Sequence, residues 1–89
     1  MATGTASDLL INKAGQDIAS CADYLAKHFA SPKTPVEKEA RKFAELAMKR
    51  LRRAVRRRSA AEISDSAKSL TKAMVYLWAV RQFHDRLNQ

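Results

Sequence analysis

Apolar residues recur at steps of three and four positions along three separate stretches of this 89-residue chain. Such spacing places apolar side chains on one face of a helix, whereas a half-buried strand would alternate them with polar ones. The chain has only 2 Gly and 2 Pro, too few for the many turns of an all-β sandwich or barrel. The sequence therefore predicts an all-α three-helix bundle with helices at about 8–30, 35–58 and 60–88.

The length allows one small helical domain, residues 1–89, with residues 1–6 as a flexible N-terminal arm. The longest apolar run, Ala73 to Val80, has eight residues, far fewer than the about 20 of a membrane span. The N-terminus lacks the basic and apolar regions of a secretory signal. A single Cys fits a reducing compartment. We therefore expect a cytoplasmic protein of bacterial or phage origin.

The first predicted helix follows Ser7, a residue type that favours the N-cap position. It ends before Pro32, because proline disfavours a helical conformation at the preceding residue. Its apolar stripe consists of Ile11, Ala14, Ile18, Cys21, Leu25 and Phe29.

The other two predicted helices each begin with a capping box. Thr34 and Glu37 form the first box, with Pro35 at the first helical position. Ser59 and Glu62 form the second. The stripe of the second helix consists of Val36, Ala40, Phe43, Ala47, Leu51 and Ala54, and that of the third consists of Ile63, Ala67, Leu70, Met74, Leu77 and Trp78.

The second and third helices could also form one continuous helix, because residues 56–62 are all acceptable in a helix. At about 100° per residue, however, a continuous helix would place Ile63 opposite Leu51 and put Arg58 within the apolar stripe. A break between Arg58 and Ala60 removes both conflicts. The continuous alternative would be a long hairpin whose core is completed by a second chain.

The end of the third predicted helix is apolar on every side, which is typical of a helix that is covered all round. Three helices of this length cannot cover it alone, so the core is completed by self-association or a partner. We expect a homodimer or a subunit of a larger complex; in the alternative, the N-terminal arm or the 31–34 loop folds over this end. The predicted interface consists of Met74, Tyr76, Leu77, Trp78, Val80 and Phe83.

The net charge of +8 is concentrated in the second predicted helix, because residues 35–58 alone carry +7. Cations near a helix C-terminus complement the helix dipole, which accounts for two or three of them. The others stand at spacings where like charges destabilise a helix, so we expect an anionic partner. The predicted binding residues are Arg41, Lys42, Lys49, Arg50, Arg52, Arg53, Arg56, Arg57 and Arg58.

Guanidinium groups match phosphate oxygens, so the sequence predicts a small nucleic-acid-binding protein or a subunit of a nucleoprotein complex. Aromatic residues are not interleaved with the cations, which favours contact with the phosphate backbone of DNA or RNA over base stacking. In the alternative, the protein is an adaptor or inhibitor, such as a phage-encoded one, that docks this helix on an acidic protein surface. A solvated face that keeps the protein soluble is a third possibility, whereas a membrane surface is disfavoured.

The sequence offers no arrangement typical of an enzyme. His28 and His84 stand apart from any Cys or carboxylate cluster, so no metal site is expected. The two glycines are isolated and form no phosphate-binding loop. A single Arg81–His84 pair is a weak indication of a nuclease. We expect no catalysis, no cofactor and no small-molecule substrate, and Cys21 fits a small buried apolar residue.

Overall fold

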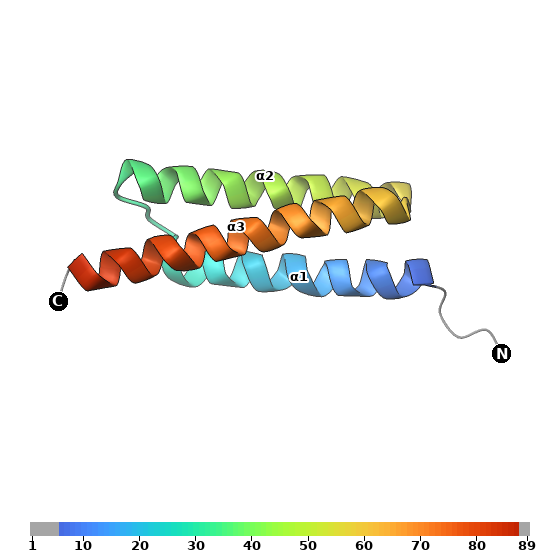
Figure 1. The fold of residues 1–89 in the computed structure, drawn as a ribbon, viewed down its shortest axis with the longest axis horizontal. Coiled ribbons are helices and arrows are strands. Elements are labelled where there is room, and N and C mark those ends of the chain that lie inside the picture. The colour runs from blue at the N-terminus through green and yellow to red at the C-terminus, as the bar shows by residue number, and fades with distance from the viewer. Residues whose placement is uncertain (1–5, 88–89) are drawn as a thin grey trace.

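The computed structural model describes residues 6–87 and the side chains of residues 8–83. These residues form three helices, α1 (Ala6–His28), α2 (Pro35–Arg57) and α3 (Ala60–Leu87), which all contact one another. The helices lie side by side, and α2 runs antiparallel to α1 and α3 (Figure 1). The described residues contain no strand, so the predicted all-α three-helix bundle is confirmed. The predicted arm at residues 1–6 lies outside the described part except for Ala6.

Helix α1 begins and ends two residues earlier than predicted, at Ala6 and His28. Ser7 therefore lies in the first turn, and its prediction as the N-cap is wrong. The residue at which a helix begins can shift by one or two positions, so a residue type that favours the N-cap does not by itself fix where the helix starts.

The predicted capping box at the start of α2 is confirmed. The Thr34 hydroxyl oxygen accepts a hydrogen bond from the Glu37 backbone N–H at 3.1 Å, and the Glu37 carboxylate accepts one from the Thr34 N–H at 3.1 Å. Pro35 occupies the first helical position. The two bonds satisfy donors that no helical carbonyl can reach.

The predicted break between α2 and α3 is also confirmed. Arg58 adopts a left-handed conformation, with φ 54° and ψ 30°, and its backbone N–H donates to the Val55 carbonyl at 3.0 Å. Ser59 caps α3, since its hydroxyl accepts from the Glu62 N–H at 3.3 Å. Two residues thus reverse the chain and bring α3 back along α2.

The core lies between the three helices and confirms most of the predicted stripes. Alanines dominate the buried face of α2, which allows the helix backbones to approach closely. The buried residues are Ala14, Cys21 and Leu25 of α1, Phe29 directly after it, Ala40, Ala44, Ala47, Met48, Leu51 and Ala54 of α2, and Ile63, Leu70, Ala73 and Leu77 of α3.

Three residues of the predicted stripes are exposed instead: Val36, Phe43 and Trp78. The buried face of α2 is centred on Ala44 and Leu51 because α2 packs against two helices, and this rotation leaves Val36 and Phe43 at one edge. Trp78 follows the buried Leu77 by about 100° around α3, which turns it out of the core.

Helix α3 also projects beyond its neighbours. It has 28 residues, against 23 each for α1 and α2, and its C-terminal end extends past the end of α1 and the start of α2 (Figure 1). Within the described part of the chain, the last part of α3 therefore has no neighbouring helix (Figure 1).

We predict that Arg58→Gly raises the free energy of unfolding by about 0.5–1 kcal/mol in a urea titration. The left-handed conformation costs a residue with a Cβ about 1–2 kcal/mol, and the greater freedom of glycine in the unfolded chain offsets part of that gain. Arg58→Val should lower the stability, because branching at Cβ makes this conformation less favourable. Equal stability of all three proteins would contradict the reversal at Arg58.

Candidate functional site

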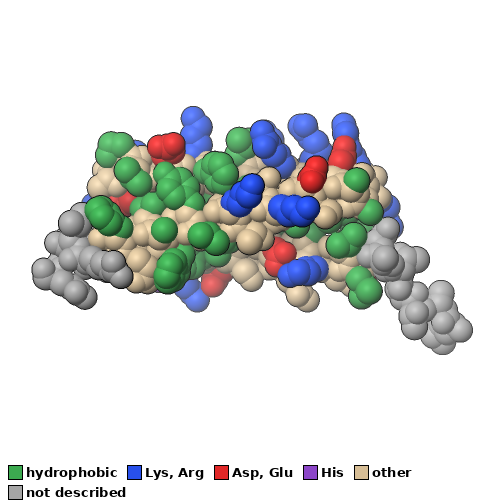
Figure 2. Space-filling model, in the orientation of Figure 1, with side chains coloured by type: hydrophobic (Ala, Val, Ile, Leu, Met, Phe, Trp, Pro, Cys, Tyr) green, Lys and Arg blue, Asp and Glu red, His purple; other side chains and the backbone are tan. Residues whose placement is uncertain are grey.

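The candidate site is the C-terminal part of α2 together with its C-cap residue Arg58, residues 49–58, which we call the basic segment. It contains seven basic side chains and no acidic one, and all seven are exposed. On one face of the molecule, the basic side chains gather toward the end where α2 meets α3 and apolar side chains toward the other end (Figure 2). At about 100° per residue, the cations cover close to half of the circumference of α2.

One row of cations follows the outer side of α2. Lys42, Lys49, Arg53 and Arg56 share this face, because they are spaced by seven, four and three residues. The row is about 21 Å long at 1.5 Å per residue. Each of these side chains is exposed, so the row is open to a partner.

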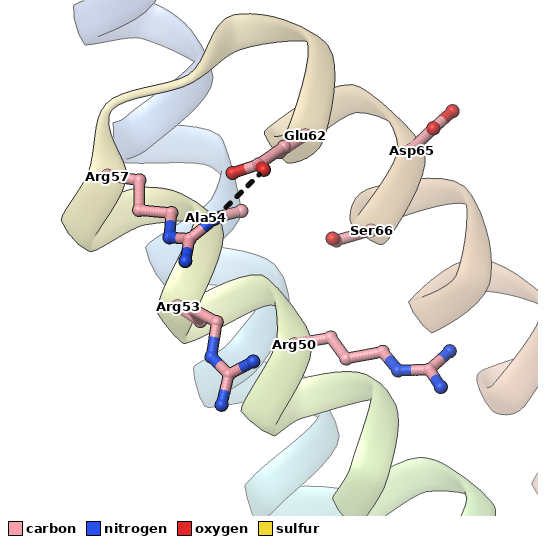
Figure 3. A pocket seen from close by; sticks show the side chains of 7 residues that line it. All are labelled: Arg50, Arg53, Ala54, Arg57, Glu62, Asp65 and Ser66. Carbon is pink, nitrogen blue, oxygen red and sulfur yellow. Dashed lines mark hydrogen bonds and ion pairs between the residues drawn. The ribbon is translucent and has the colours of Figure 1, made fainter.

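A hollow of about 290 Å³, which we call the α2–α3 hollow, lies between α2 and α3. Arg53 of the outer row lines it together with Arg50 and Arg57. Ser66 of α3 points into the space between the helices, whereas Asp65 points away from the arginines (Figure 3). The hollow is therefore lined by guanidinium groups and one hydroxyl, which suit an anion, and by the carboxylate of Glu62, which is paired with Arg57.

The structure adds α3 residues that the sequence analysis did not assign to this surface. A second hollow of about 370 Å³ continues from Arg50 and is lined by Ser66, Lys68, Ser69 and Lys72 of α3, with Asp65. Lys68 and Lys72 are spaced by four residues, so they lie on one face of α3. This spacing is the only signal in the sequence, and it does not show that the face adjoins α2.

The basic segment is largely without counter-charges. Among the described side chains, Arg57 is its only member in an ion pair, with 3.4 Å between its Nη1 and Oε1 of Glu62 (Figure 3). Both partners are well exposed, so the pair contributes little to stability. Six cations within ten residues are thus left to repel one another or to meet an external anion.

Arg41 belongs to the structure of the bundle rather than to the exposed row. Its Nη1 donates to the backbone carbonyls of Phe29 at 3.0 Å and Ala30 at 3.1 Å, and its Nε lies 3.7 Å from Glu45 Oε2. It thereby caps the C-terminal end of α1, where carbonyls have no helical partner. Of the predicted binding residues, Arg41 is set apart by these bonds.

Arg52 faces α1, on the side opposite the α2–α3 hollow. Burial raises the pKa of the Cys21 thiol, and the positive charge of Arg52 opposes that rise. Cys21 is fully buried, as expected for a small apolar residue, and a protonated thiol is a weak nucleophile.

The predicted interface residues separate into three groups. Leu77 is buried in the core, Met74, Tyr76 and Val80 pack partly against it, and Trp78 and Phe83 are 58% and 65% exposed. The sequence analysis missed Val75, which is 61% exposed. Leu77 is thus unavailable to a partner, whereas the other five remain accessible to different degrees.

No group of three or more His, Cys, Asp or Glu side chains among the described residues is placed to hold a metal ion. His28 packs its ring against Tyr24, with 4.6 Å between the ring centroids, whereas the His84 side chain lies outside the described part. None of the described helices has the length and apolarity to cross a membrane.

No protein-family model, curated protein or solved structure matches this chain.

We predict that Arg41→Ala lowers the free energy of unfolding by about 1 kcal/mol, because it removes two charge-assisted hydrogen bonds at a partly exposed site. The matched control is Lys42→Ala, which removes the same charge one residue later from an exposed side chain. Urea unfolding of both variants should show the loss for Arg41→Ala alone. An equal change in both would contradict a capping role.

Proposed function

We propose that this protein binds nucleic acid through phosphate contacts made by the basic segment, as a small nucleic-acid-binding protein or as a subunit of a nucleoprotein complex. The observation that carries the proposal is the density of exposed, unpaired cations: six in ten residues among the described side chains. Ten residues of helix span about 15 Å. Duplex DNA carries one phosphate charge per about 1.7 Å of its axis, so few other partners offer a comparable charge density.

The repulsion within the basic segment supports an anionic partner. Arg52–Arg56 and Arg53–Arg57 are like-charge pairs at a spacing of four residues, and Arg53–Arg56 is one at a spacing of three. Each such pair destabilises a helix by a few tenths of a kcal/mol. Phosphates placed between these side chains would remove the repulsion between them. The counterions released as each contact forms would also favour binding.

The placement of the aromatic side chains favours backbone contact over stacking on bases. Phe43, Trp78 and Phe83 are exposed, but none lies in the basic segment. Residues 35–81 also contain no Asn or Gln, the side chains that pair with adenine in the major groove. We therefore expect binding with little sequence preference.

The length of the exposed row indicates the size of the binding site. From Lys42 to Arg56 it extends about 21 Å, which corresponds to about six steps of 3.4 Å along one strand of a duplex. Arg50, Lys68 and Lys72 would add contacts from the α3 side. Short duplexes of DNA and RNA are therefore sufficient as probes.

We predict that the protein binds short duplexes in a fluorescence-polarisation titration and that affinity falls steeply as salt increases. Arg50→Ala, Arg53→Ala and Arg56→Ala should each weaken binding moderately and reduce the salt slope by about one phosphate contact. The matched control is Lys27→Ala on α1, where Lys27 pairs with Asp23 at 3.1 Å. It removes the same charge from another face and should leave the slope unchanged.

The same titration separates the proposal from docking on an acidic protein. Absence of binding at low salt would contradict nucleic-acid binding. A pull-down of protein partners from cells would then be compared between the wild type and the variant with Arg50, Arg53 and Arg56 all changed to Ala. On a protein partner, one or two arginines should dominate, each with a loss of about 2 kcal/mol or more, while the rest stay near neutral.

A further inference from the structure

The end of the bundle opposite the basic segment carries an apolar surface formed by α2 and α3. Between positions 74 and 83 the exposed residues of α3 are Val75, Trp78, Ala79, Gln82 and Phe83, so Gln82 is the only polar one. Green side chains gather over this end of the molecule in Figure 2. We define the apolar surface as Val36 and Phe43 of α2 with Val75, Tyr76, Ala79, Val80 and Phe83 of α3.

The apolar surface contains both a groove and projecting rings. The groove has a volume of about 470 Å³ and lies between the first turn of α2 and the end of α3, where Val36, Tyr76 and Val80 line it. Phe43 packs edge-on against Tyr76 in the groove wall, with 6.3 Å between the ring centroids. Phe83 lies at the groove and is 65% exposed.

We propose that a second copy of this chain docks on the apolar surface, in an antiparallel arrangement that places the two basic segments at opposite ends of the dimer. A two-fold interface requires a surface that is complementary to itself. This surface meets the requirement, because each copy presents a groove and a ring that can enter the groove of the other.

The area of the apolar surface fits a dimer. Aromatic side chains cover about 150–250 Å² each, so Phe43 and Phe83 together expose roughly 200 Å² at 44% and 65%. The three valines, Ala79 and Tyr76 raise the apolar area of the surface to on the order of 500 Å². Interfaces are about 60% apolar, so the full contact would be about 800 Å² per copy, the usual size of a stable interface.

The charge distribution favours the antiparallel arrangement. Residues 35–48 carry three basic and three acidic side chains, whereas residues 49–58 carry seven basic ones. The apolar surface therefore lies on the neutral part of α2, and two copies can meet there without repulsion. Parallel copies would place both basic segments side by side at the same end of the dimer, whereas antiparallel copies place them at opposite ends.

The oligomeric state tests this interface. Light scattering after size exclusion should give the mass of a dimer for the wild type. Val36→Glu and Phe83→Glu should each raise the dimer dissociation constant at least about tenfold, because a carboxylate would be buried without a partner. Glu at position 36 also stands in the first turn of α2, where the helix dipole favours it, so the folded monomer is retained.

The matched control is Leu9→Glu. Leu9 is 67% exposed and lies in α1 near the end of the bundle opposite the apolar surface, so the variant makes the same charge change elsewhere and should stay dimeric. Circular dichroism should show equal helix content in all three variants. A monomeric wild type, or a dimer unaffected by both Val36→Glu and Phe83→Glu, would overturn the proposal.

The arrangement is measured separately, with spin labels on Ala61→Cys in a Cys21→Ala background. Ala61 is exposed in the first turn of α3 and lies 18 residues from Ala79, the centre of the exposed apolar positions. At 1.5 Å per residue, an antiparallel dimer separates the labels by about 54 Å. A distance near the width of one bundle, 20 Å, would overturn the antiparallel arrangement. These tests use no nucleic acid, so they are independent of the proposed function.

Discussion

The arrangement of the molecule depends on the chain reversal at Arg58 and Ser59. Because Arg58 adopts a left-handed conformation and Ser59 caps the next helix, α3 begins directly beside the last turn of α2. Only then can α3 line the α2–α3 hollow with Ser66 and place Lys68 and Lys72 beside Arg50. Without the reversal, α2 and α3 would be a single helix with Arg58 in its apolar stripe, and the basic segment would have no neighbour.

The same reversal separates two chemically different ends. α2 is neutral over residues 35–48 and strongly basic over 49–58. Since α3 runs back along α2, its apolar C-terminal part lies beside the neutral half and its polar start beside the basic half. The longer α3 then carries Phe83 toward the end of the bundle (Figure 1). An apolar contact and an anionic contact can therefore form at the two ends without disturbing each other.

The sequence predicted the features that depend on local interactions. The Thr34–Glu37 capping box, the break after Arg58 and the burial of Leu51 and Leu70 all follow from residues within a few positions of one another. The sequence-based predictions were wrong where packing between helices determines which side chains are buried. Phe43 and Trp78 belong to apolar stripes by spacing alone, but they are exposed because the rotation of each helix about its axis is set by contacts with two others.

The basic residues show why spacing alone could not define the candidate site. Arg41 and Arg57 are of the same residue type as their neighbours, yet the side chain of each has a role inside the fold: Arg41 caps α1, and Arg57 pairs with Glu62 across the turn. When these residues are set aside, a smaller group of basic side chains remains, and the fold does not explain their exposure. Lys49, Arg50, Arg53 and Arg56 belong to that group. The proposed nucleic-acid contact would account for these four, because the fold would be more stable with uncharged side chains in their places.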